Sequence, residues 1–292
     1  MYRKSRATLT RARVTWMSRK LVAPTEKAIK LTPVHANLGI EAAYRKKLQA
    51  LIAEMSNSVI YWTRSTWKKN PPLASIAQDR MGYRQPLIDL RRTMDRLARH
   101  WQKRFDELGP ELAKVFVDGA TATTDAAMMA SLKNAGFSVK FQMTQAAKEG
   151  YQAVLQENVG LIKSIPSEYL TDVQQKVWGA VKSGHDLETL TKGLQSDYGV
   201  SFRRASLIAR DQSNKAKAVI ENVRRKELGI TQAIWQHSGG GKEPRPDHVK
   251  AGQDKLVYDL DKGAYIGGKW ILPGTEINCR CTSRAIIPGF ED

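Results

Sequence analysis

The stretch that decides the fold is residues 41–69, EAAYRKKLQALIAEMSNSVIYWTRSTWKK, which the pair Pro71-Pro72 follows closely. Its apolar side chains recur at the i, i+3, i+4, i+7 spacing that is typical of one buried face of an α-helix. These side chains are Leu48, Leu51, Ile52, Met55, Val59 and Trp62. Because proline does not continue a helix, the proline pair ends the pattern. The sequence therefore predicts a long amphipathic helix over 41–69.

Further helical patterns follow, and proline or glycine separates each from the next. They predict helices over 86–108, 111–136, 144–165, 167–184, 186–199 and 201–229, with a short strand over 137–143. From Ile230 onward the pattern changes to short strands, over 231–236, around Tyr265 and Trp270, and over 285–287, while residues 238–253 are expected to form a long loop. The predicted fold class is mainly α, with long amphipathic helices in the first half and an α+β unit at the C-terminal end.

The charge of the chain lies mostly in its first half. The 292 residues carry a formal net charge of +18, and residues 1–150 hold 27 basic against 12 acidic side chains. Because clustered cations displace the counterions of phosphates, this asymmetry indicates a polyanionic partner. At 41% hydrophobic residues the composition is that of a globular protein, which excludes a wholly disordered polycation.

Two groups of cations are candidates for binding nucleic acid. One lies in a basic N-terminal arm, and the other crowds one face of the predicted helix over 86–108. The candidate residues are Arg3, Lys4, Arg6, Arg11 and Arg13 in the arm, and Arg91, Arg92, Arg96 and Arg99 in the helix. The alternative is that both groups are solvated and contact nothing specific.

Cysteine use and hydropathy favour a cytosolic protein. We find no apolar run long enough to span a membrane and no secretory signal. Cys279 and Cys281, the two cysteines of the chain, are two positions apart, a spacing poorly suited to a relaxed disulfide. These observations exclude a secreted disulfide scaffold.

The last sixty residues concentrate the polar side chains that carry chemistry, and three interpretations remain open. The first is a zinc site, with His237, His248, Cys279 and Cys281 as candidate ligands and Asp247 as an alternative to His237. The second is a metal-dependent nuclease site built on Asp247, His248 and Asn278. The third is structural: Arg245, Asp247 and His248 form a polar cluster that holds the long loop. Neither a phosphate-binding P-loop nor a serine nucleophile elbow occurs in the sequence.

Four segments in the second half resemble a known family. They are IPSEYLTDVQQKVWGAVKSGHDLETLTKGL, SFRRASLIARDQSNKAKAVIENVRRKELGITQAIWQHS, RPDHVKAGQ and LPGTEINCRC, and their order and spacing are similar to the phage Mu protein F-like head morphogenesis proteins. The resemblance covers about the last 45% of the chain. It divides the sequence into a basic arm (1–40), a basic helical region (41–164) and a head morphogenesis domain (165–292).

The resemblance implies a minor capsid protein of a tailed phage or prophage, without enzymatic activity. Such proteins lie inside the head near the portal vertex and act in assembly, packaging or ejection. The implied partners are the portal protein, packaged double-stranded DNA, and the major capsid or scaffolding protein, with the host cytoplasm as the compartment of assembly. A structural role is implied for Trp235, Arg245, His248, Gly252, Pro273, Gly274, Cys279, Arg280 and Cys281. The alternative is a metal-dependent nuclease or toxin-like enzyme that uses the Asp247 and His248 region.

Overall fold

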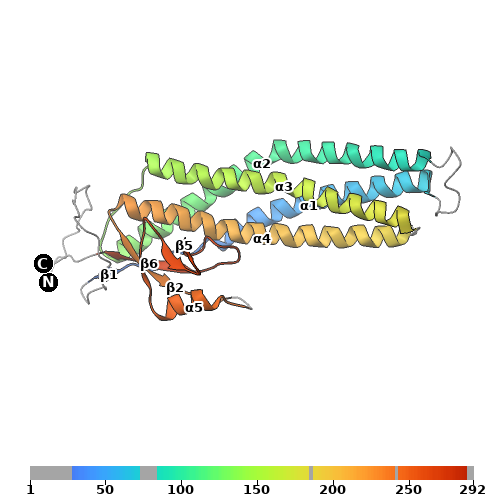
Figure 1. Ribbon diagram of the computed structural model, residues 1–292. Helices are drawn as coiled ribbons and strands as arrows, with labels where there is room; N and C mark the ends of the chain where they lie inside the picture. Colours follow the sequence, from blue (N-terminus) through green and yellow to red (C-terminus); the bar gives the residue numbers. More distant parts are fainter. Residues whose placement is uncertain (1–27, 73–83, 184–186, 241–242, 288–292) are drawn as a thin grey trace. The chain divides into compact units, whose positions relative to one another are not determined.

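A computed structural model describes residues 28–72, 84–183, 187–240 and 243–287 (Figure 1). Within these ranges the helices are α1 (Leu38–Lys69), α2 (Arg84–Asn134), α3 (Gln145–Ser183), α4 (Leu187–Glu227) and α5 (Pro246–Gln253). The strands are β1 (Ile29–Lys30), β2 (Gln232–Gln236), β3 (Val257–Asp259), β4 (Ala264–Ile266), β5 (Lys269–Ile271) and β6 (Thr282–Ile287). The predicted fold class is confirmed: the protein is mainly helical with a small antiparallel sheet region at the C-terminal end.

The chain forms two compact units, and α1, α2, α3 and α4 each contribute to both. The helical unit comprises Ala42–Val115 and Gln156–Ala209. The mixed unit comprises Met1–Glu41, Phe116–Leu155 and Arg210–Asp292. The division predicted from the sequence, into a basic arm (1–40), a basic helical region (41–164) and a head morphogenesis domain (165–292), is a division by function. It stays a prediction.

The helical unit is built on the apolar face that the sequence predicts for α1. Leu48, Ile52 and Met55 are fully buried, and two buried hydrogen bonds join α1 to α3. The hydroxyl of Tyr44 donates to Oδ1 of Asn158 at 3.1 Å, and the hydroxyl of Tyr169 donates to Oγ of Ser56 at 2.9 Å. These bonds satisfy the polar groups that the packing of α1 on α3 buries.

Three helix breaks predicted from the sequence do not occur. α2 runs through Pro110, α3 through Pro166 and α4 through Gly199, each as one continuous helix. Next to the first of these positions Gly109 is a packing site: a Cβ added there would lie 3.3 Å from Cγ2 of Ile162 on α3. Buried contacts along the helix outweigh the hydrogen bond that an internal proline removes, so the helix continues.

The strand predicted over 137–143 is also absent from the described residues. Phe137 is buried, as the alternating apolar pattern suggests. The backbone nearby, however, forms a hydrogen bond with a side chain and not with a neighbouring strand. The carbonyl oxygen of Gln142 accepts a hydrogen bond from Nη1 of Arg224 at 2.6 Å, and the same guanidinium lies over the ring of Phe141. This segment is therefore an extended connection between α2 and α3.

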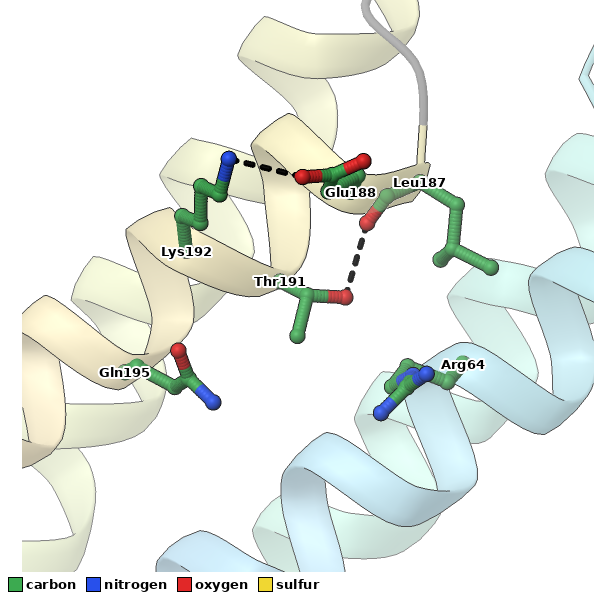
Figure 2. A pocket seen from close by; sticks show the side chains of 6 residues that line it. All are labelled: Arg64, Leu187, Glu188, Thr191, Lys192 and Gln195. Carbon is green, nitrogen blue, oxygen red and sulfur yellow. Dashed lines mark hydrogen bonds and ion pairs between the residues drawn. The ribbon is translucent and has the colours of Figure 1, made fainter.

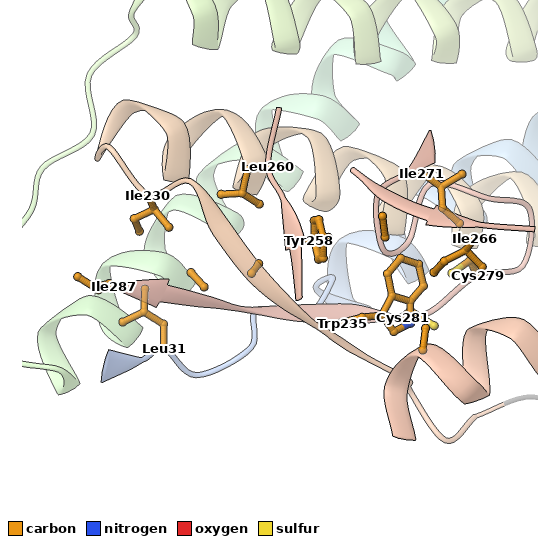
Figure 3. Close-up of a cluster of buried hydrophobic side chains, with 14 of the residues drawn as sticks. Leu31, Ile230, Trp235, Tyr258, Leu260, Ile266, Ile271, Cys279, Cys281 and Ile287 are labelled. Carbon is orange, nitrogen blue, oxygen red and sulfur yellow. The ribbon is translucent and has the colours of Figure 1, made fainter. Parts of the chain in front are cut away.

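The mixed unit contains a four-stranded antiparallel sheet in the order β1-β6-β2-β3, and β4 pairs with β5 separately. Central strand β2 pairs along its whole length with β6, from Gln232 opposite Ile286 to Gln236 opposite Thr282. Trp235 of β2 is completely buried in the core cluster, which Figure 3 shows with Leu31, Ile271 and Ile287. The strands predicted near 231–236, 265, 270 and 285–287 are confirmed.

Helix α5 replaces the second part of the predicted loop. Pro246 occupies a first-turn position, where its missing N–H costs nothing because no helical carbonyl is there to accept it. The side chain of Asp247 supports the same turn, since its Oδ1 accepts a hydrogen bond from the backbone N–H of His248 at 2.9 Å. The glycines and prolines before residue 247 make the whole segment resemble a loop in the sequence.

Candidate functional site: a buried histidine and cysteine cluster

The backbone brings α5 very close to the end of β2. A Cβ added to Gly252 would lie only 2.6 Å from Cβ of His237 and 2.8 Å from its backbone nitrogen. Only glycine permits this approach without displacing the main chain. The approach places His248, on the buried face of α5, against the indole of Trp235, with ring centroids 5.2 Å apart.

The two cysteines lie on a turn that several side chains and two unusual backbone conformations hold. Gly274 has φ +94, and a Cβ there would approach the carbonyl oxygen of Cys281 to 3.3 Å. Asn278 has φ 60, and its N–H donates to Oδ1 of Asp211 at 2.8 Å. Nη2 of Arg245 donates to the carbonyl oxygen of Ile277 at 2.9 Å. Thus α4 and the N-terminal end of α5 both fix the turn that carries the cysteines.

His248, Cys279 and Cys281 form one buried cluster. These residues are 3–4% exposed, and their ligand atoms lie within 4.8 Å of one another. Nδ1 of His248 is 3.5 Å from Sγ of Cys279 and 3.8 Å from Sγ of Cys281. Figure 3 shows the two cysteine side chains beside Trp235. Three groups that bind soft or borderline metal ions therefore converge on one point.

A carboxylate lies on the other side of the imidazole. Oε2 of Glu276 is 3.3 Å from Nε2 of His248, and Glu276 also forms ion pairs with Lys269 and Arg245. The hydrogen bond from Lys269 is the largest cause that holds the pKa of Glu276 below its ordinary value, so Glu276 is ionised. Within the described residues Nε2 of His248 makes no hydrogen bond, but the negative charge beside it favours the tautomer that carries its proton there and leaves the Nδ1 lone pair facing the sulfurs.

The two thiols differ in their surroundings. A hydrogen bond from Cys281 lowers the pKa of Cys279 to about 5, and backbone N–H groups of Cys281 and Gly274 act in the same direction against the effect of burial. The same thiol contact and burial raise the pKa of Cys281. The pair therefore shares one negative charge readily, with Cys279 as its preferred location.

The structure unites three of the four predicted zinc ligands and leaves one outside. Within the described residues His237 does not join the metal-binding group; its Nδ1 accepts a hydrogen bond from the N–H of Gly239 at 3.2 Å. Asp247 serves the first turn of α5, and Asn278 is exposed on the turn. Of the remaining motif residues, Pro273 and Gly274 are buried and Arg280 is exposed.

The predicted nucleic-acid residues divide into two groups. Arg3, Lys4, Arg6, Arg11 and Arg13 lie outside the described residues. Arg91, Arg92, Arg96 and Arg99 are all exposed on α2 in the helical unit. The guanidinium of Arg96 lies over the ring of Trp62, 5.2 Å from its centroid. Trp62, predicted to be part of the α1 core, is 43% exposed and supports this basic face instead.

Two features escape the sequence patterns. Glu276 joins the cluster although nothing in its neighbours marks it. The second feature is a buried charge network on α4, in which Glu221 pairs with both Lys217 and Arg225. The i, i+4 spacing of these three residues is a usable signal, because apolar residues flank them on the same helix.

A polar pocket in the helical unit, drawn in Figure 2, contains no comparable convergence. It is lined by Arg64, Leu187, Glu188, Thr191, Lys192 and Gln195. Its polar groups are partly engaged with each other, since Lys192 pairs with Glu188 at 2.7 Å and Thr191 donates to the carbonyl oxygen of Leu187. The cysteine and histidine cluster is therefore the stronger candidate site.

Comparison with known proteins agrees with the C-terminal motifs. The chain is 26% identical over 268 residues to an uncharacterized protein of Haemophilus influenzae (strain ATCC 51907 / DSM 11121 / KW20 / Rd), covering 91% of this chain but 57% of that protein. The chain thus spans little more than half of the relative it matches. No solved structure matches significantly. None of the described helices is long and apolar enough to cross a membrane.

Residues 171–284 match the family described as "Phage Mu protein F like protein". This match includes α4, the four-stranded sheet except β1 and the end of β6, and the whole His248, Cys279 and Cys281 cluster. The protein therefore contains a phage Mu protein F-like domain over residues 171–284.

Proposed function

We propose that the protein is a minor head protein of a tailed phage or prophage, which acts in head assembly and in DNA packaging or ejection near the portal. The observation that carries the proposal is the Mu F-like domain over 171–284, a family whose role is in phage head morphogenesis. Membership of this family implies a place in the virion. The position near the portal, and the portal, capsid or scaffolding proteins as partners, belong to the proposal.

The virion test is direct. We expect the protein in purified, nuclease-treated particles by quantitative mass spectrometry, at a few copies per head relative to the major capsid protein. Particles assembled without it should package less DNA or fail to deliver it. Its absence from complete particles would contradict the proposal. Crosslinking within the particle should connect it to the portal protein, and crosslinks to tail proteins alone would contradict a location near the portal inside the head.

The basic first half is proposed to bind packaged DNA without sequence preference. Its described support is the exposed arginine face of α2, where Arg92, Arg96 and Arg99 follow one another at i, i+4 and i+7 and so share one side of the helix. Few acidic side chains lie within this stretch, and the guanidinium of Arg96 lies over the aromatic ring of Trp62. Binding to phosphates in this way gives affinity without base recognition.

Salt dependence of binding tests this interaction. Replacing Arg91, Arg92, Arg96 and Arg99 by glutamine is expected to weaken binding to duplex DNA. The slope of log K against log salt should flatten by about 0.9 for each phosphate that the variant no longer neutralises. A matched control replaces four exposed lysines of the mixed unit by glutamine: Lys140, Lys148, Lys250 and Lys255. Equal weakening in both variants would show that net charge, and not the α2 face, determines binding.

The proposed role requires no catalytic step, and a cleavage assay separates it from the nuclease alternative. Duplex DNA incubated with the protein and Mg²⁺ or Zn²⁺ is expected to stay intact. Cleavage that is abolished in His248→Ala but kept in His100→Ala, a substitution of an exposed histidine on α2, would favour the nuclease and contradict a purely structural protein.

A further inference from the structure

We infer that His248, Cys279 and Cys281 bind one zinc ion. The inference is independent of the proposed function, because it rests on the geometry of the cluster alone. All three side chains are almost fully buried, and their ligand atoms meet within 4.8 Å.

The distances fit tetrahedral coordination. With Zn–S bonds of about 2.3 Å and Zn–N bonds of about 2.0–2.1 Å, a tetrahedral site separates nitrogen from sulfur by about 3.6 Å. The observed separations between Nδ1 of His248 and the two sulfurs are 3.5 Å and 3.8 Å. A zinc ion between the three atoms would therefore need only small movements of the side chains.

Hydrogen bonds can link the three groups only as a chain, from Cys281 to Cys279 and from Cys279 to Nδ1 of His248. Neutral imidazole has one lone pair at Nδ1, so it accepts a proton from one thiol but not from two at once. Both sulfurs nevertheless lie at contact distance from the same nitrogen. One metal ion would satisfy the nitrogen lone pair and both sulfurs together. Two thiolates would also balance the charge of Zn²⁺, so the buried centre would be neutral.

The surroundings are those of a metal-binding histidine and of thiolates. Glu276 lies 3.3 Å from Nε2 of His248, in the place where a carboxylate orients the ring of a metal-binding histidine. The buried Nε1–H of Trp235 faces Cys281 and acts on that thiol as a hydrogen-bond donor. A zinc-bound thiolate would accept this hydrogen bond more strongly than a neutral thiol does.

The ion would join segments that are distant in sequence. His248 belongs to α5, while Cys279 and Cys281 lie on the turn that leads into β6. The described contacts that otherwise join α5 to this turn include the hydrogen bond of Arg245 with Ile277 and the ion pairs of Glu276 with Arg245 and His248. Zinc would thus act as a crosslink that fixes the turn onto α5.

Metal content and spectroscopy of the full chain test the site. Protein purified from zinc-supplemented cells is expected to hold one zinc per chain by elemental analysis, and Cys279→Ser and His248→Ala are each expected to reduce this content below about a tenth. Glu276→Ala is expected to keep the site but weaken zinc affinity about 10- to 100-fold. His237→Ala is the matched control, since His237 lies near the cluster but outside it, and it should retain the full zinc content.

A measurement on the unmodified protein protects the test against variants that fail to fold. Replacing zinc by Co²⁺ should give thiolate charge-transfer absorption in the near ultraviolet and the strong visible bands of tetrahedral cobalt. Both thiols should resist a thiol reagent until a chelator is added. Stoichiometric zinc that persists in His248→Ala, loss of zinc in His237→Ala, or unmodified protein that takes up neither zinc nor cobalt would overturn the assignment.

Discussion

Glu221 is the shared acid of a buried charge network that links α4 to the sheet. Its two carboxylate oxygens pair with Lys217, at 3.4 Å, and with Arg225, and all three side chains are 2–4% exposed. Arg225 continues the network into β6, because its guanidinium donates to Oγ of Ser283 at 2.7 Å and to the carbonyl oxygen of Ser283 at 3.0 Å. One acid thus balances two buried cations and indirectly orients a strand.

Glu221→Gln is expected to destabilise the protein by about 3–5 kcal/mol, because it removes the negative partner of two buried cations. Lys217 and Arg225 would then be buried without the carboxylate that pairs with them. Urea unfolding followed by circular dichroism measures the change. A large loss of stability without a change in the slope of the transition would locate the effect in the folded state.

The control is an equivalent pair on the same helix. Glu188 pairs with Lys192 at 2.7 Å, also four residues apart, but these side chains are 77% and 72% exposed. Glu188→Gln should therefore change stability by less than about 1 kcal/mol. Similar losses in the two variants would contradict the role given to burial.

For single residues, the sequence indicates which side chains are candidates for the site better than it indicates which of them lie together. His248, Cys279 and Cys281 stand out in the sequence because imidazole and thiolate groups are the usual ligands of zinc. His237 stands out for the same reason, although its Nδ1 accepts a hydrogen bond from Gly239 and it lies outside the cluster. Glu276 does not stand out, because nothing in the sequence distinguishes it from an acid on the surface. Which side chains meet depends on the turn at 274–278, whose conformation no local pattern specifies.

The sequence predicts the presence of the helices and strands more accurately than it predicts where they begin and end. Pro110 and Pro166 lie inside helices because each interrupts one hydrogen bond, whereas the flanking residues bury apolar faces over many turns. The opposite error occurs at α5, where a proline-rich and glycine-rich start hides a two-turn helix. A proline or glycine in the sequence indicates a tendency to end a helix. Burial of the flanking apolar residues decides whether the helix ends there.

The close approach of α5 to β2 gives a prediction for these elements. Gly252→Ala is expected to cost about 1–3 kcal/mol, because the added methyl group would lie 2.6 Å from Cβ of His237 and 2.8 Å from a backbone nitrogen that cannot move aside freely. Thermal unfolding measures the loss, and increased reactivity of Cys279 toward a thiol reagent would show that α5 has moved away from the turn.

Gly179→Ala is the matched control, since this glycine is also helical but has no atom within 4 Å of an added Cβ. There the substitution should stabilise the protein by about 0.5–1 kcal/mol through helix propensity. Opposite signs for the two variants would support the packing argument. Stabilisation by both would show that α5 and β2 can separate at little cost.

For the molecule as a whole, the matched family segment does not contain its complete core. The hydrophobic cluster around Trp235 includes Leu31, Leu132 and Phe137, all of which precede residue 171. Arg224 on α4 likewise forms a double hydrogen bond with Asp125 on α2, at 2.9 Å and 2.8 Å. The Mu F-like domain is thus completed by residues of the first half, which also carries most of the positive charge.

The segment before α1 tests this dependence. Ile29 pairs with Ile287, and Leu31 is 5% exposed and donates its N–H to the carbonyl oxygen of Ala285. A chain that begins at residue 38 should therefore be less stable than one that begins at residue 28 by at least about 2 kcal/mol, the lower end of the usual cost of truncating one buried leucine. Urea unfolding of both chains measures the difference, and Leu31→Ala in the longer chain should reproduce much of it. Equal stability of the two chains would mean that β1 adds nothing to the sheet, and that the domain from β2 onward does not depend on the segment before α1.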